Sequence, residues 1–245
     1  MSSQQQDSFI EEEDLPTRAI ETYQYLVPTY IAELSVQGCL HEWTNRIELS
    51  ALEEYDRAQL LREVARFFAM AFVASQDEKL ETSKALEGSV SQAIEAVSDF
   101  LSPSIITQLN TTGGLLFSSK YPQVLVPRDP MQGIVVSEAT NRIVGISDWE
   151  DVAVQPFGMG LDCLYWLTGY VQSIWGWQPY GCRGRLLDAF WEEFWQAAGI
   201  EEILPGRRGN FREVAEIAAK VGLLARCDLD ADDFVKFTLR EMLTE

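Results

Sequence analysis

The sequence predicts an α+β fold in which helices make up most of the chain and a few short strands form a small insert. Apolar residues recur at helical spacing in long segments, and short β-branched runs are grouped between these segments. The strands do not alternate with helices as they do in βαβ units. The chain has 245 residues, 47% of them hydrophobic, which suffices for one large domain or two small ones.

The first part of the chain is expected to change from a polar arm to short strands. Residues 1–22 are polar and acidic, and we expect a flexible arm there. Residues 23–36 are rich in β-forming residues, and Pro28 breaks them into one or two short strands. Gly38 is expected to form a turn after these strands.

Helices are expected next, separated by a loop. The clearest one spans residues 50–75 and begins with a Ser-x-x-Glu capping box. Another is expected over residues 89–105, where Pro103 should stop it. The glycine-containing segment 110–119, NTTGGLLFSS, is interpreted as a loop.

The central insert holds three expected strands, followed by a helical region. One strand lies in QVLVPRD at 123–129. The other two lie in GIVVSEATNRIVGISDWE at 133–150 and form a hairpin through a polar turn. The segment SIWGWQPYGCRG, at 173–184, is rich in Gly and Pro and is interpreted as a loop. The remaining helices are expected at 184–199, 211–226 and 231–243.

Charge and cysteine usage limit the classes of partner. The formal net charge of −19 repels nucleic acid and anionic membranes, so we expect neither as a partner. The simplest interpretation of this acidity is solubility. The four cysteines form no CxxC pair, so a zinc site is not expected. The N-terminus lacks an apolar signal segment, and no apolar run approaches 18 residues, so a reduced, cytoplasmic protein is expected.

Two aspartates follow apolar strands in the insert. Asp129 comes after VLV, and Asp148 comes after IVGIS. Two carboxylates at neighbouring strand ends are able to share a divalent cation such as Mg²⁺, or to act as a base and a metal ligand. A purely structural explanation stands beside this one, because aspartate often caps the turn after a strand. The residues alone leave both explanations open.

Aromatic residues are concentrated downstream of the insert. They are Tyr165, Trp166, Tyr170, Trp175, Trp177 and Tyr180. Such a set is able to line a pocket for an apolar or planar ligand, and core packing is the alternative for each residue. Three of the six lie in the expected loop at 173–184, where packing alone rarely requires two tryptophans and a tyrosine. We therefore expect this segment to cover a small-molecule pocket.

The segment 124–151 resembles the catalytic segment of the aminoglycoside phosphotransferase and choline kinase-like family, which has the protein kinase fold. VLVPRD resembles the loop that supplies the catalytic aspartate, and GISDWED resembles the motif that supplies a Mg²⁺ ligand. VAVQPFGMGLDCL, at 152–164, resembles an extension of fungal members. The resemblance covers about residues 23–198. It implies a reduced N-lobe and hinge at 23–40 and a helical C-lobe at 41–245.

The resemblance implies roles for three residues. Asp129 corresponds to the catalytic base, Arg128 lies beside it, and Asp148 corresponds to the Mg²⁺ ligand. The family's histidine and metal-binding asparagine are replaced here by Pro127 and Ile134. The first glycine of the chain is at 38 and the first lysine is at 79, so the glycine loop and strand lysine of a nucleotide site are missing upstream of the C-lobe.

Three functions remain open, in order of preference. The first is a degenerate phosphotransferase-like protein whose C-lobe pocket binds or converts a metabolite without conventional ATP phosphotransfer. The second is a non-catalytic, pseudokinase-like interaction protein, in which a second copy or another partner covers the truncated N-lobe side. The third is a phosphotransferase acting on a small-molecule hydroxyl. Mg²⁺ and ATP are expected as cofactors only in the third case.

Overall fold

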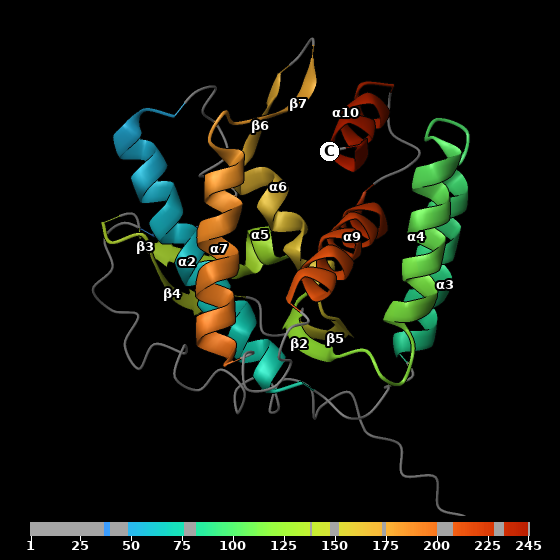
Figure 1. The fold of residues 1–245 in the computed structure, drawn as a ribbon, viewed down its shortest axis with the longest axis horizontal. Coiled ribbons are helices and arrows are strands. Elements are labelled where there is room, and N and C mark those ends of the chain that lie inside the picture. The colour runs from blue at the N-terminus through green and yellow to red at the C-terminus, as the bar shows by residue number, and fades with distance from the viewer. Residues whose placement is uncertain are drawn as a thin grey trace, which may run out of the picture.

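The computed structural model describes most of the chain after the N-terminal region. The described residues are 37–39, 49–75, 82–137, 139–147, 152–172, 175–199, 208–227 and 233–244. Helices make up most of the described chain beside three small antiparallel sheets, so the predicted α+β class is confirmed (Figure 1). The expected arm at 1–22 and the expected strands at 23–36 lie outside the described residues, as does Asp148.

The helices and strands follow one another in a defined order. The helical elements are α2 (Ala51–Val73), α3 (Thr82–Ala96), α4 (Pro103–Leu116), α5 (Pro130–Gly133), the 3-10 helix η3 (Met159–Asp162), α6 (Cys163–Leu167), α7 (Arg183–Ala198), α9 (Arg208–Arg226) and α10 (Asp233–Thr244). The strands are β1 (Gln37–Cys39), β2 (Gln123–Pro127), β3 (Ile134–Ser137), β4 (Arg142–Ile146), β5 (Val152–Pro156), β6 (Gly169–Gln172) and β7 (Gly176–Pro179).

Helices α2 and α7 pack along each other and form one side of the molecule (Figure 1). The predicted capping box of α2 is confirmed, because Ser50 Oγ accepts from the Glu53 amide while Glu53 Oε2 accepts from the Ser50 amide. Helix α7 ends as predicted at Gly199, whose φ of 62° is the left-handed conformation that glycine adopts without strain.

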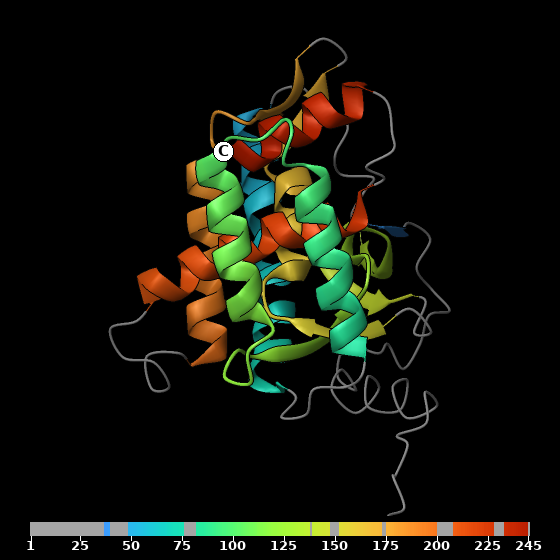
Figure 2. The ribbon, with the colours of Figure 1, turned by 90° about the vertical axis from the view of Figure 1, so that its right-hand side faces the viewer.

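The region between α2 and the sheets differs from the prediction. One helix was expected over 89–105, but α3 ends at Ala96 and a separate helix, α4, begins at Pro103. Proline fits the first turn of a helix because it lacks only an amide proton that no helical carbonyl would accept, and Ser102 caps the Ile105 amide. Residues 110–116 of the loop expected at 110–119 therefore belong to α4, and the prediction is wrong for them. Helices α3 and α4 lie side by side and cross α9 (Figure 2).

The strands form three separate antiparallel sheets. The expected hairpin is confirmed as β3 and β4. Strand β1 pairs with β3 on the edge opposite β4. Gly38 lies within β1, so the turn expected at Gly38 is wrong. Strand β2 pairs with β5, and β6 pairs with β7. Strand β7 occupies residues 176–179 of the loop expected at 173–184, because paired backbones satisfy their amides even where Gly and Pro are frequent.

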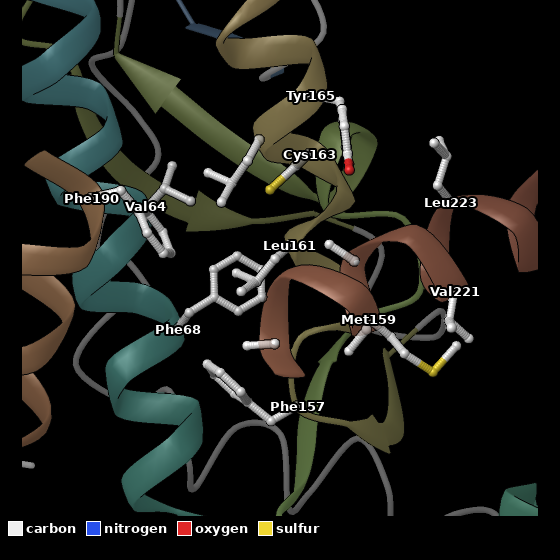
Figure 3. Packing of buried hydrophobic residues seen from close by; sticks show 14 of the residues in the cluster. Val64, Phe68, Phe157, Met159, Leu161, Cys163, Tyr165, Phe190, Val221 and Leu223 are labelled. Atoms are coloured by element: carbon white, nitrogen blue, oxygen red, sulfur yellow. The ribbon is translucent and has the colours of Figure 1, made fainter. Parts of the chain in front are cut away.

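The core is centred on η3, where α2, α7 and α9 meet. Phe68 of α2 packs toward Leu161 of η3, and Phe157 lies below them (Figure 3). Helix α9 approaches η3 so closely that a Cβ at Gly222 would collide with the Met159 carbonyl. This contact requires glycine in the middle of a helix, where it is otherwise unfavourable.

Within the ranges that the structure describes, no helix is long and apolar enough to cross a lipid bilayer.

Candidate functional site

The turn after β2 positions Asp129 as a helix cap. Its Oδ1 accepts a hydrogen bond of 2.9 Å from the Met131 amide at the start of α5, and the carboxylate is half-buried. This is the structural role that the sequence left open beside the catalytic one. A carboxylate has about four acceptor positions, so this single bond leaves Asp129 able to bind a further donor. The neighbouring Arg128 has an exposed side chain.

A buried ion pair supports this turn from below. Arg226, at the end of α9, donates from Nε to Asp162 Oδ2 at 2.9 Å, and its Nη2 lies 2.6 Å from Asp162 Oδ1. The same guanidinium donates from Nη1 to the Arg128 carbonyl at 3.0 Å and from Nη2 to the Met159 carbonyl. Arg226 therefore ties α9, η3 and the turn of Asp129 into one unit.

Burial and charge act in opposite directions on this pair. Burial raises the pKa of Asp162, and Arg226 offsets part of that increase. Burial lowers the pKa of Arg226, but the nearby Asp162, Asp129 and Cys163 raise it by more. The pKa of Arg226 therefore lies above its ordinary value. The sequence does not reveal this unit, because Asp162 and Arg226 are 64 residues apart and no local pattern connects them.

The predicted ligand-contacting aromatics occupy different environments, and Tyr165 is buried in the core. Trp177 is 1% exposed, and its indole nitrogen donates to the Tyr165 carbonyl at 3.0 Å, so core packing accounts for it without a ligand. Trp175 is 63% exposed at the end of the β6–β7 hairpin. Trp166 is half-buried and packs against the core. The structure does not gather these three tryptophans into one pocket wall.

The two tyrosines do come together, in what we call the tyrosine hollow. The rings of Tyr170 and Tyr180 lie 5.5 Å apart, tilted by 31°. They line a hollow of about 380 Å³ between the starts of α2 and α7 and the base of the β6–β7 hairpin. The remaining lining residues are Leu49, Glu54, Pro179, Gly181, Cys182 and Arg185. This volume lies within the range of ligand sites, about 300–1,000 Å³.

The walls of the tyrosine hollow combine aromatic faces with fixed charges. Arg185 donates from Nε and Nη2 to both carboxylate oxygens of Glu54, at 2.7 and 2.9 Å. This pairing lowers the pKa of Glu54, although burial opposes the effect. Arg57 lies 5.8 Å from the centre of the Tyr180 ring and is itself buried. The arrangement is able to stack a planar group and to present a donor and an acceptor beside it.

The second predicted aspartate lies outside the described residues, and so does His41. The strands that precede the two aspartates, β2 and β4, belong to different sheets. No group of three or more His, Cys, Asp or Glu residues within the described ranges is arranged to hold a metal ion. The predicted Mg²⁺ ligand Asp148 therefore remains a prediction.

No family model, no curated protein and no solved structure matches the chain. The resemblance of residues 124–151 to the phosphotransferase-like family accordingly stays a prediction. Within the described residues, the tyrosine hollow brings together two of the predicted binding residues, Tyr170 and Tyr180.

Proposed function

We propose that this protein binds a small molecule in the tyrosine hollow. The proposal rests on Tyr170 and Tyr180, whose rings lie side by side in a hollow of about 380 Å³. Both tyrosines were predicted from the sequence to contact a ligand. A ring that enters this space contacts aromatic faces, and the Glu54–Arg185 pair offers polar contacts at its edge. The ligand class that fits is a metabolite with a planar part and polar substituents.

The proposal includes a degenerate phosphotransferase-like architecture. The order of elements supports it: a long helix, a strand that ends two residues before Asp129, a β hairpin, and helices after it. The replacements at Pro127 and Ile134 and the late first lysine, Lys79, argue against conventional ATP phosphotransfer. Binding, or conversion without ATP, is therefore the function we propose.

Ligand retention tests the proposal. The purified protein is mixed with a small-molecule extract of cells, passed rapidly through a desalting column, and the retained compounds are identified by mass spectrometry. Tyr170→Ala and Arg185→Ala should reduce the retained compound at least about 10-fold, because each removes a wall of the hollow. Tyr55→Ala is the matched control, since Tyr55 is 59% exposed on α2 and does not line the hollow. Equal retention by all variants would contradict the proposal.

One observation favours a second candidate, a phosphotransferase that uses Asp129. This carboxylate follows β2, is half-buried and has spare acceptor capacity. The candidate requires that Mg-ATP raise the melting temperature of the protein and that Asp148→Ala abolish the rise. Asp129→Asn should then remove turnover while keeping the cap, since asparagine caps helices as well as aspartate does. A melting temperature that Mg-ATP does not change would exclude this candidate.

A further inference from the structure

A second hollow lies in the helical part of the molecule, and it shares no lining residue with the tyrosine hollow. We call it the α9 cavity. It has a volume of about 310 Å³ and lies between α4, η3, α6, α7 and the middle of α9. A ligand in the α9 cavity would therefore leave the side chains of the tyrosine hollow uncovered.

The inner wall of the α9 cavity is apolar. Leu161, Leu164 and Leu187 line it from η3, α6 and α7, and Ile217 lines it from α9. All four are buried members of the core, so packing on their other sides fixes their positions. Tyr165, one of the aromatic residues predicted to line a pocket, adds a ring to this wall. Such a wall favours a compact apolar or planar group over water.

The charges around the α9 cavity cancel one another. Three basic and two acidic side chains line it, and one further carboxylate lies 3.2 Å from a lining arginine. The basic residues are Arg183, Arg212 and Lys220, and the acidic residues are Glu213, Glu216 and, outside the lining, Asp188. An ion that entered would lose hydration against the apolar wall, and the rim has no net charge to compensate for this loss. The cavity therefore favours an uncharged ligand.

The basic side chains of the α9 cavity already have partners. Arg212 donates from Nε to Glu216 Oε1 at 2.8 Å, and Lys220 donates from Nζ to the Leu243 carbonyl at 2.8 Å. Arg183 lies against two aromatic rings, with its Cζ 5.5 and 5.4 Å from their centres. An anionic ligand would have to compete with these contacts, which again favours an uncharged one.

One hydrogen-bond acceptor at the α9 cavity is still open. Oε1 of Glu216 accepts from Arg212 Nε at 2.8 Å and from the indole nitrogen of Trp191 at 3.1 Å. These two bonds fix the carboxylate, and within the described ranges no donor bonds to its Oε2. A carboxylate oxygen accepts hydrogen bonds and does not donate them. Glu216 therefore offers a positioned acceptor for an O–H or N–H group of a ligand.

We propose that the α9 cavity binds an uncharged planar molecule with one hydrogen-bond donor, such as a phenol or an N–H heterocycle. Glu216 Oε2 accepts from this donor, while the leucines and Tyr165 contact the ring. A hydrogen bond to a charged acceptor is stronger than one between neutral groups, so the donor decides which planar molecules bind. The volume lies near the lower end of the range of ligand sites, about 300–1,000 Å³, and suits one or two rings.

Two isosteric probes, indole and benzofuran, test this proposal by titration calorimetry at neutral pH. They have the same shape, but only indole carries an N–H group. We expect indole to bind at least about 10-fold more tightly, because benzofuran leaves Glu216 Oε2 without a donor. Glu216→Gln should reduce this preference below about twofold. The glutamine oxygen keeps both bonds of Oε1, and its amide nitrogen, a donor, takes the place of Oε2.

Matched variants separate the acceptor from the charge and from the other hollow. Glu192→Gln removes the same charge from an exposed position on α7 outside the cavity, so the preference for indole should persist. The preference should also persist in Tyr170→Ala, whose altered side chain lies in the tyrosine hollow. Failure of the tyrosine hollow to retain a ligand would leave these results unaffected.

A blocking variant locates the indole site. Gln108 is exposed on α4 and lines the α9 cavity, so Gln108→Trp should weaken indole binding at least about 10-fold without unfolding the core. Asn110→Trp is the control, because Asn110 is exposed on the same helix and does not line the cavity. Absence of indole binding, equal affinity for both probes, a preference that survives Glu216→Gln, or tighter binding of the anion indole-2-carboxylate would each overturn the proposal.

Discussion

Asp162 and Arg226 form a two-pronged ion pair in the interior, with the Nη2–Oδ1 distance at 2.6 Å and the Nε–Oδ2 distance at 2.9 Å. The Asp162 side chain is 7% exposed and that of Arg226 is 22% exposed. Two backbone carbonyls accept from two further N–H groups of Arg226, and one of these carbonyls lies in the turn of Asp129. The geometry of the turn after β2 thus depends on a residue at the far end of α9.

Removing the cation of this pair should be costly. Arg226→Met leaves the Asp162 carboxylate buried without its partner, and we expect a loss of about 3–5 kcal/mol in the free energy of unfolding, measured in urea. Arg226→Met combined with Asp162→Asn should recover part of this loss, because the buried charge is then removed as well.

The control for Arg226 is an exposed arginine. Arg240 pairs with Glu241 at 3.3 Å with a side chain that is 46% exposed. Arg240→Met should cost less than about 1 kcal/mol. Similar losses for Arg226→Met and Arg240→Met would show that Arg226 does not organise the interior.

Two helical glycines should respond in opposite directions to the same substitution. Gly222→Ala places a methyl group against the Met159 carbonyl, so we expect it to lower the free energy of unfolding by about 1–3 kcal/mol. Gly114→Ala meets open space on the exposed side of α4 and should raise it by about 0.5–1 kcal/mol. Thermal and urea unfolding of both variants would reveal whether α9 packs on η3 as described.

The two tryptophans of the β6–β7 hairpin should differ as strongly. Trp177→Ala removes a buried ring and its hydrogen bond, and we expect a loss of about 3–5 kcal/mol in unfolding free energy. Trp175→Ala should change stability by less than about 0.5 kcal/mol, since that side chain is mostly exposed. Comparable urea midpoints for the two variants would contradict the placement of Trp177 in the core.

The Cys227 thiol should react slowly and titrate late. Burial is the main cause that raises its pKa to about 11, with Asp162 adding to the effect. At pH 8 the thiolate fraction of Cys227 should be about 100-fold smaller than that of a thiol with the ordinary pKa. The more basic thiolate is nearly tenfold more nucleophilic, so alkylation should be about tenfold slower than for a free thiol. Peptide-resolved mass spectrometry should show a rate that rises nearly tenfold between pH 9 and 10. A rise of only about twofold over this range, as expected for a thiol of ordinary pKa in the urea-unfolded chain, would contradict this.

The raised pKa of Cys227 also makes the free energy of unfolding depend on pH. The folded state holds the proton on Cys227 more firmly than the unfolded state, so this group's contribution is fully present below pH 9, near its ordinary pKa. It is lost as the pH rises from there through about 11. Cys227→Ala should therefore flatten the decline of stability over this pH range, as measured by urea unfolding.

Local patterns predicted the elements whose signals are local. The capping box at Ser50, the hairpin of β3 and β4 and the glycine stop of α7 all follow from neighbouring residues, and all are confirmed. Helix α4 was missed because its second half is polar and contains two glycines. Buried contacts stabilise the helix instead. Gly113 faces α3, and a Cβ added at this position would be in van der Waals contact with Ile94, at 3.8 Å.

The sites depend on contacts that no local pattern encodes. Tyr170 and Tyr180 were predicted as ligand contacts from composition, but only the pairing of β6 with β7 brings their rings together. Trp177 carried the same compositional signal but lies in the core, where its indole nitrogen donates to the Tyr165 carbonyl.

Protection of Cys182 from alkylation tests ligand binding in the tyrosine hollow most directly. Cys182 lines the hollow, whereas Cys227 lies beside Asp162 and Arg226 and serves as an internal control. The protein is treated with iodoacetamide at pH 8.5, with and without the retained compound, and both thiols are followed by peptide mass spectrometry. We predict that the compound slows alkylation of Cys182 at least about fivefold, leaves Cys227 unchanged, and loses this effect in Tyr170→Ala. A bound compound that leaves the Cys182 rate unchanged would contradict the proposed site.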